Sequence, residues 1–551
     1  MLIEFLLIPC LFISFAGWGA WTKMIIKNKT DSFSLTVFLG FTLFGISTCL
    51  LSFFVPLNIY VEAALLIFSL IPFLSKKIRA YSITFPKELL KSVWFWIFCI
   101  IIIVAGSYQP FRPDHFSYYQ STINWLNKYG LIIGVANIDW LLGQNSLFHI
   151  IQAGLDQTID PFQRFNVFVT ILFLVYIFER KAWLLLFSIP FYFLFIQAPS
   201  PDIIIVFLAL LVVNELCFNF NAGNYKILLI ISVFAFTIKP VAFWLPLWTF
   251  ITGFFLNKRE LKDFRIYLIP ALLVIIFLIK NVVVSSTLFY PVVLTKLNTY
   301  WLTDANILEM SSQRASLHTF NFYLTGDEIS KMTFFKSIYF WLSINKLQTI
   351  VNCFMTIIIV SFGIFAFLKK NIIYKSLWII VIIKFFIIFS FSGQYRFLLE
   401  SIYPLLLIMF YTIKIGKTKL FVFGLSYFLL LLIFISYPPI LKKSIPEFKL
   451  TERMKGYTSK ALLIPERNDK IEYTTGGFGN LTFNISPHHY VYDIPPPAFT
   501  LKQLKLYYEL GIFPQMKDST NIRKGYYMKN FTPTVIERSR TTEQRNSSDE
   551  D

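Results

Sequence analysis

The sequence is poor in charged residues, which make up only 15% of its 551 residues. Soluble domains carry about 25% charged residues. Hydrophobic residues make up 56% of the chain, and 19% of it is aromatic. One water-soluble core cannot hide this excess. Because apolar runs recur near the roughly 20 residues that cross a bilayer, the sequence predicts an all-α polytopic membrane protein.

Cysteine is scarce, and the usual motifs of soluble enzymes are missing. The five cysteines lie in or at the end of apolar runs, with no metal-type spacing and no plausible pairing, and we interpret them as small core residues. No P-loop, nucleophile elbow or thiol pair occurs, and Gly476-Gly-Phe-Gly479 is too short for a nucleotide loop. The N-terminal apolar run lacks a basic leader region, so we expect it to be a retained first helix.

The positive charge is distributed in the manner of a membrane protein. The formal net charge is +19, which in a soluble protein would suggest nucleic-acid binding. Here most Lys and Arg residues form short clusters between apolar runs, and no interleaved basic stripe or nucleic-acid-binding fold is recognisable. The sequence therefore argues against a nucleic-acid partner.

The apolar runs predict about fourteen crossings. They fall at about 2–21, 33–53, 57–74, 92–107, 165–179, 183–197, 202–217, 227–238, 241–256, 266–284, 348–368, 375–391, 398–413 and 419–437. Alternate short loops are basic, which predicts that those loops are cytoplasmic. This orientation puts the N-terminus and the region after Tyr437 outside.

We assign residues 1–437 to a polytopic transmembrane domain that includes two outer loops, and the residues after it to a separate C-terminal region. The outer loop 108–164 is the predicted active loop and contains re-entrant or interfacial helices, because glycine and polar residues break its apolar stretch. A second outer loop covers 285–335. Residues 438–537 are expected to form a small extracytoplasmic α+β or loop-rich appendage, followed by a disordered tail at 538–551.

Asp114 is the leading candidate for chemistry. It opens the predicted active loop, where a carboxylate suits a general base toward an acceptor hydroxyl, or a metal ligand together with His115. A solvated loop acid is the plain alternative. Beside it, Arg112, His115 and Tyr118 are candidates for substrate binding, and the Tyr118 ring suits stacking on a sugar.

Asp202, Lys239 and Arg396 are predicted on the same outer face. Asp202 follows Pro199-Ser-Pro201 and is a candidate substrate-binding residue, which could share base and metal or acceptor roles with Asp114. The alternative is an acid that caps a helix. Lys239 precedes a proline that interrupts an apolar segment, and Arg396 interrupts a pair of apolar helices. Cations at this depth bind anions, pair or snorkel, and for Arg396 the alternative is an ion pair with Glu400.

These features together resemble a known class of enzyme. The outer-loop aspartate in Pro113-Asp-His-Phe-Ser-Tyr-Tyr119, many crossings, a broken Lys239-Pro240 segment and an outer C-terminal appendage are similar to the GT-C membrane glycosyltransferases. Gly143-Gln-Asn-Ser146 and Ser200-Pro-Asp202 resemble bacterial multi-pass proteins associated with cell-surface polysaccharide. The Asp-Glu pair of several GT-C families is absent, because His115 follows Asp114.

The resemblance implies an inverting transfer of a sugar from a polyprenyl-phosphate donor to a glycan or lipid-linked acceptor outside the bacterial inner membrane. Asp114 would be the base, and Arg396 or Lys239 would stabilise the lipid-phosphate leaving group. No cofactor is certain, and a requirement for a divalent metal stays open. The alternatives are a lipid-linked glycan polymerase or ligase, a transporter or flippase, and a structural membrane subunit.

Overall fold

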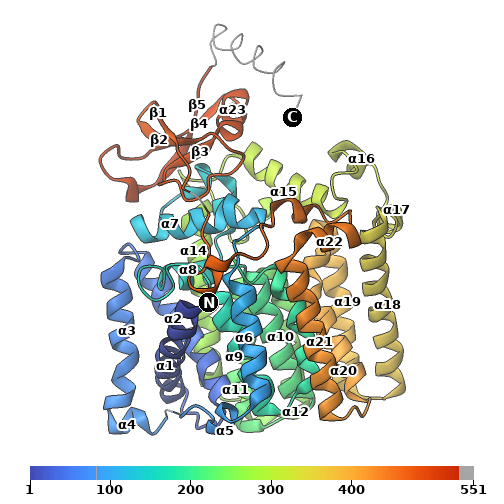
Figure 1. Cartoon of the computed structure of the whole chain (residues 1–551). Coiled ribbons are helices and arrows are strands. Elements are labelled where there is room, and N and C mark those ends of the chain that lie inside the picture. Colours follow the sequence, from blue (N-terminus) through green and yellow to red (C-terminus); the bar gives the residue numbers. More distant parts are fainter. Residues whose placement is uncertain (82, 469, 533–551) are drawn as a thin grey trace. The chain divides into compact units, whose positions relative to one another are not determined.

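The computed structural model describes residues 1–81, 83–468 and 470–532 (Figure 1). These residues form two compact units. Unit 1 comprises 1–115, 146–277 and 313–468, and unit 2 comprises 116–145, 278–312 and 470–532. The predicted disorder at 538–551 lies outside the described residues.

Unit 1 is a helical bundle built from the apolar runs of the sequence. Its α-helices are α1 (Leu2–Ile25), α2 (Phe33–Ser52), α3 (Ile59–Leu74), α4 (Lys76–Arg79), α5 (Lys87–Leu90), α6 (Val93–Ser107), α8 (Leu147–Ala153), α9 (Phe165–Arg180), α10 (Pro201–Cys217), α11 (Tyr225–Ile238), α12 (Trp244–Leu256), α13 (Lys258–Leu261), α16 (Gly326–Ser330), α17 (Phe334–Trp341), α18 (Lys346–Leu368), α19 (Ile372–Ser392), α20 (Leu399–Tyr411), α21 (Lys417–Ser436) and α22 (Pro438–Ser444). Two further helices, α14 (Leu268–Ser285) and α15 (Ala305–Thr319), begin in one unit and end in the other.

The predicted number of crossings is not supported. Among the described residues, six helical segments are long and apolar enough to cross a membrane: Leu2–Ile25, Phe33–Ser52, Phe264–Ser285, Lys346–Leu368, Ile372–Ser392 and Lys417–Ser436. Several others are shorter, such as α12 with 13 residues. At 1.5 Å per residue, such a helix does not span the roughly 30 Å hydrocarbon layer alone. The predicted run at 183–197 forms two 3-10 helices, Trp183–Ser188 and Pro190–Leu194, instead of an α-helix.

The inner and outer helices differ in how much of their side-chain surface is buried. Most side chains of α2 and α10 are buried, whereas α18, α19 and α21 expose large apolar side chains along their length. Of these, α18 and α19 run side by side at one edge of the bundle (Figure 1), whereas α21 packs against α6. Exposed apolar faces of this extent are typical of lipid contact.

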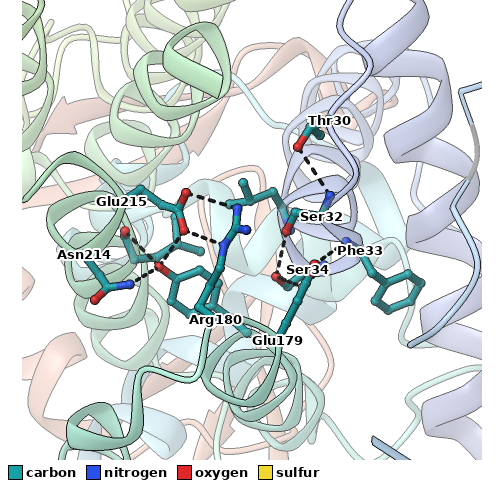
Figure 2. A network of polar contacts seen from close by, with 11 residues as sticks. Thr30, Ser32, Phe33, Ser34, Glu179, Arg180, Asn214 and Glu215 are labelled. Atoms are coloured by element: carbon teal, nitrogen blue, oxygen red, sulfur yellow. Dashed lines mark hydrogen bonds and ion pairs between the residues drawn. The ribbon is translucent and has the colours of Figure 1, made fainter. Parts of the chain in front are cut away.

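At one end of unit 1, polar contacts connect basic loops that the sequence predicts to be cytoplasmic. Glu179, near the end of α9, accepts hydrogen bonds from the backbone N–H groups of Phe33 (2.9 Å) and Ser34 (3.0 Å), and so caps the start of α2. Its neighbour Arg180 points the other way and forms a forked pair with Glu215 of α10, at 2.7 and 3.1 Å (Figure 2). The loops next to these residues therefore lie together, and the side of the membrane that they face stays a prediction.

The opposite end of unit 1 is organised by two buried charged residues. Glu62 of α3 accepts hydrogen bonds from the backbone N–H groups of residues 157–159 at 2.8 to 3.2 Å. Arg164 donates to four carbonyl oxygens, those of Phe162, Gln197, Tyr108 and Glu466. These contacts fix the loops that follow α6 and precede α9 and α10.

Unit 2 contains the strands of the structure. Its elements are α7 (Gln120–Tyr129), the 3-10 helices Val135–Asn137 and Trp140–Gln144, β1 (Thr474–Phe478), β2 (Leu481–Ser486), β3 (Ala498–Thr500), α23 (Leu501–Glu509), β4 (Ile512–Met516) and β5 (Tyr526–Asn530). β1 and β2 form an antiparallel hairpin, β3 joins β2 in parallel, and β4 and β5 form a separate antiparallel pair. The small C-terminal strand region agrees with the predicted α+β appendage.

The predicted active loop contains short helices and no long one. A π-helical turn, His115–Tyr119, leads into α7. The stretch after Gly130, which we expected to be interfacial or re-entrant, forms two 3-10 helices and then the seven-residue α8.

Candidate functional site

Asp114 and Arg396 form an ion pair within unit 1. Asp114 follows the end of α6, and Arg396 lies on a 3-10 turn, Tyr395–Phe397, between α19 and α20. The Arg396 Nη1 donates to the Asp114 Oδ2 at 2.8 Å, and each side chain keeps about a quarter of its surface exposed. The pair is therefore accessible to a ligand.

A second ion pair, between Lys239 and Asp202, lies beside the first. Asp202 is in the first turn of α10, after the N-capping Ser200, and Lys239 is the extended residue where α11 ends before Pro240. The Lys239 Nζ lies 4.5 Å from the centroid of the Phe397 ring, and the Arg396 Cζ lies 5.1 Å from the same centroid. The two cations therefore lie next to the same aromatic ring.

The turn that carries Arg396 is held from several directions. Gly393 donates its N–H to the Thr319 hydroxyl of α15 at 2.8 Å, and its carbonyl accepts from the Trp341 indole of α17 at 2.8 Å. Gln394 accepts from the Arg396 Nε at 2.9 Å. These contacts give the guanidinium a fixed approach to Asp114.

The cations around Asp114 set its protonation state. Burial alone would raise the pKa of the Asp114 carboxyl, but the charges of Arg396 and Arg112 outweigh burial and hold this pKa below its usual range. The Arg112 guanidinium stacks on the Phe195 ring, with its Cζ 4.1 Å from the centroid. Asp114 is therefore an ionised carboxylate at neutral pH.

Two histidines accompany the ion pairs. Burial lowers the pKa of His115 to about 3, with smaller effects from Arg164 and His149, so His115 is neutral at physiological pH. His318 of α15 was not singled out from the sequence. Burial lowers its pKa as well, and the charges of Arg396 and Asp114 act on it. His318 therefore belongs to the surroundings of the site.

The structure thus brings together five of the residues that the sequence predicts for a site: Arg112, Asp114, Asp202, Lys239 and Arg396. His115 is adjacent to Asp114 in the chain and buried. Tyr118 belongs to unit 2, where its ring contacts Tyr119 with centroids 4.6 Å apart.

An ion pair between Arg396 and Glu400 was the alternative interpretation of the sequence. The structure does not form this pair. The Glu400 carboxylate is fully buried and pairs with Lys384 of α19, which is also fully buried. The Trp244 indole donates to the Glu400 Oε1 at 3.3 Å, and Lys384 donates to the Ser401 hydroxyl at 3.0 Å. Lys384 was not predicted from the sequence, although a lysine within an apolar run is itself a signal.

The described residues contain no group of three or more His, Cys, Asp or Glu side chains suited to hold a metal ion. Asp114 and Asp202, the carboxylates considered for this role, are each paired with a cation. The requirement for a metal therefore stays open.

Residues 1–403 match the model of a protein family described as a domain of unknown function, DUF8201. Because this match covers more than half of the chain, the protein belongs to that family. No curated protein and no solved structure matches the chain.

Proposed function

We propose that the protein is a membrane glycosyltransferase of the bacterial inner membrane, with its C-terminal region outside the cytoplasm. It would move a sugar from a polyprenyl-phosphate donor to a glycan or lipid-linked acceptor. The observation that carries the proposal is the accessible ion pair of Asp114 and Arg396, with Lys239 beside it. The pair combines a proton acceptor with a phosphate-binding group.

In this reaction the acceptor hydroxyl oxygen forms a bond to the anomeric carbon of the donor sugar. The bond from that carbon to the phosphate oxygen breaks, and the polyprenyl phosphate leaves with the bonding electrons. Asp114 takes the proton of the acceptor hydroxyl. Arg396 and Lys239 stabilise the charge that develops on the departing phosphate.

The ion pair of Asp114 and Arg396 implies that the donor binds before Asp114 acts as a base. In the pair, Arg396 occupies one oxygen of Asp114 and lowers its basicity. A donor phosphate attracts the planar fork of Arg396, which donates two parallel hydrogen bonds to such groups. When Arg396 turns to the phosphate, Asp114 loses its closest cation and becomes a stronger base. Donor binding therefore activates the base that serves the acceptor.

The other predicted residues have supporting roles in the same scheme. Arg112, stacked on Phe195, adds positive charge beside Asp114. His115 is neutral and buried, which suits a hydrogen bond to a sugar better than a charge contact. Tyr118 belongs to unit 2, and its stacking on a sugar ring stays a prediction from the sequence.

A flippase is the second candidate function, and the buried pair of Lys384 and Glu400 favours it. Charged residues within membrane helices often mark a transport path. The pair is fully enclosed, whereas Asp114 and Arg396 are partly exposed. We therefore rank transfer of a sugar above transport.

The test uses the purified protein in lipid nanodiscs with a panel of radiolabelled sugars linked to polyprenyl phosphate and polyprenyl pyrophosphate. Asp114→Asn should fold normally and lose transfer by a factor of about 100 or more, as expected for a missing general base. The matched control is Asp518→Asn, which removes a carboxylate from an exposed pair with Lys524 at 2.8 Å and should leave transfer unchanged.

Full transfer activity in Asp114→Asn would remove the assigned base. If no donor of the panel is consumed while a labelled lipid-linked sugar crosses the bilayer of proteoliposomes, the protein is a flippase and the proposed chemistry is rejected.

A further inference from the structure

Two large aromatic side chains project from α17 without packing on the bundle. Phe335 is 82% exposed and Tyr339 is 75% exposed. They are four residues apart, so they share one face of the helix. On the other side of α17, the rings of Phe334 and Trp341 pack against Phe389 of α19, with centroids 5.7 and 5.8 Å apart. The orientation of α17 is thus set by its packing, and the exposed face is not a frayed end.

The exposed face of α17 continues an apolar surface on the helices next to it. α18 exposes Ile350, Phe354 and Ile357, each by more than half, at the spacing of one helical face. On α19, Phe386 is 46% exposed, and it also contacts Phe334, with centroids 5.8 Å apart. Both α18 and α19 are long and apolar enough to cross a membrane. The surface beside α17 is therefore the one that lipid would cover.

We propose that α17 is an interfacial helix that lies in the headgroup region of the bilayer, with Phe335 and Tyr339 inserted among the lipids. Tyrosine concentrates at this level of the membrane because its ring is apolar and its hydroxyl is polar, and phenylalanine is typical of the apolar face of an interfacial helix. The exposed Lys336 of the same helix suits contact with lipid phosphates. Continuity with α18 and α19 favours lipid over a protein partner as the occupant of this face.

The position of α17 has a consequence for the site. The Trp341 indole donates to the carbonyl of Gly393, three residues before Arg396, at 2.8 Å. The carbonyl of Trp341 accepts from Asn352 of α18, also at 2.8 Å. A helix anchored at the interface therefore holds the Arg396 turn at the depth of lipid headgroups. This second step rests on the proposed function, because it takes the phosphate of a membrane lipid as the ligand of Arg396.

The position of α17 is tested by nitroxide labels at Phe335→Cys and Tyr339→Cys, in full-length protein in nanodiscs of phosphatidylethanolamine and phosphatidylglycerol. The accessible native cysteines Cys10, Cys217 and Cys353 are replaced by alanine, whereas Cys49 and Cys99 are buried and stay. Reference labels are Ile357→Cys, on the exposed apolar face of α18, and Gly326→Cys, where a side chain meets open space.

Collision rates with oxygen and with a water-soluble nickel chelate give the depth of each label. We expect both α17 labels at headgroup depth, between the two references. Labels as accessible to the chelate as the one at 326 would overturn the proposal. So would labels shielded from both reagents or broadened by a second copy, since either result means a protein partner on this face.

The link to the site is tested separately with the variant Phe335→Glu/Tyr339→Glu. It should raise the KM for a long-chain polyprenyl donor about tenfold and leave the KM for a short, water-soluble analogue unchanged. Equal effects on both donors, or no effect on either, would reject the link. If the labels report headgroup depth and no donor is used by any variant, the position of α17 stands and the proposed function fails.

Discussion

Asp114 and Arg396 are 282 positions apart in the sequence, and the Arg396 Nη1 lies 2.8 Å from the Asp114 Oδ2. A contact over such a separation requires that α6, the turn after α19 and the start of α20 be assembled together. Since each partner keeps part of its surface exposed, the pair can exchange its internal contact for one with a ligand.

Arg396→Gln should move the acidic limb of transfer activity to higher pH. In the wild type, the cations hold the pKa of Asp114 below its usual range, so activity persists until the pH falls below that range. Without Arg396, burial is less opposed and this pKa rises, so Asp114 becomes protonated at a higher pH as the solution is acidified. The measurement is kcat/KM for the donor against pH, which reports the free enzyme with the ion pair intact, normalised to the plateau of each variant. Superimposable profiles would contradict the coupling.

Replacing either partner of the Lys239–Asp202 pair should change the KM for the donor, in opposite directions for the two residues. Lys239→Gln removes a cation and should raise the KM for the donor about tenfold, which corresponds to one charge-assisted hydrogen bond of about 1.5 kcal/mol. Asp202→Asn frees Lys239 from its ion pair and should lower the same KM. Steady-state kinetics in nanodiscs check both. If Asp202→Asn weakens donor binding as much as Lys239→Gln, the aspartate itself binds the donor.

Lys384→Met should strongly destabilise unit 1, because it leaves Glu400 charged and without a counterion in a fully buried position. Losing one partner of such a pair costs about 3–5 kcal/mol. The double variant Lys384→Met/Glu400→Gln should recover most of the loss, because a neutral amide still accepts from the Trp244 indole. Thermal unfolding in detergent measures both.

The control for this cycle is Lys91→Met. It breaks an exposed pair with Glu88 and should leave the Tm unchanged. A double variant no more stable than Lys384→Met alone would show that Glu400 is needed as a charge.

Asp160→Asn should stabilise the protein more at pH 7.5 than at pH 5. Burial raises the pKa of Asp160 to about 6, so its protonated form is the one that the fold favours. Its stabilising contribution is present below the unfolded pKa and is lost as the pH rises through about 6, a change on the order of 3 kcal/mol. Asparagine mimics the protonated acid at every pH. The difference in Tm between variant and wild type should therefore grow with pH, and a constant difference would show that Asp160 does not titrate in this range.

Gly134→Ala should destabilise unit 2. Gly134 has a positive φ of +65°, and a Cβ there would lie 2.3 Å from the carbonyl oxygen of Tyr526, a backbone atom that cannot give way cheaply. We expect a loss on the order of 2 kcal/mol, seen as faster proteolysis of residues 470–532. The control is Gly326→Ala, where the added methyl group meets open space. Equal cleavage of both variants would contradict the predicted clash.

The sequence predicted the helices well, because long apolar runs and proline breaks act locally. The run at 202–217 became α10 (Pro201–Cys217), and Pro240 separated α11 from α12 as expected. The run at 183–197 became two 3-10 helices, although its composition resembles the others. The predicted number of crossings was not supported, because composition identifies apolar helices but does not show whether each helix is long enough to cross a bilayer.

The composition of the site was predictable, but its pairing was not. Lys239 and Arg396 stood out because each interrupts an apolar segment. The sequence spacing offered Glu400 as an alternative partner of Arg396, but in the structure Glu400 pairs with Lys384, which lies 16 positions earlier on another helix. His318 was missed because only the packing of α15 on the Arg396 turn brings it near the site. Partner choice depends on tertiary contacts, which local patterns do not encode.

The buried pair of Lys384 and Glu400 also constrains how the protein is made. Either helix entering lipid alone would carry an unneutralised charge into hydrocarbon, whereas α19 and α20 entering as a hairpin carry a neutral pair. Biogenesis should therefore deliver the two helices from the translocon in one step, and a ribosome stalled between them should leave α19 poorly inserted.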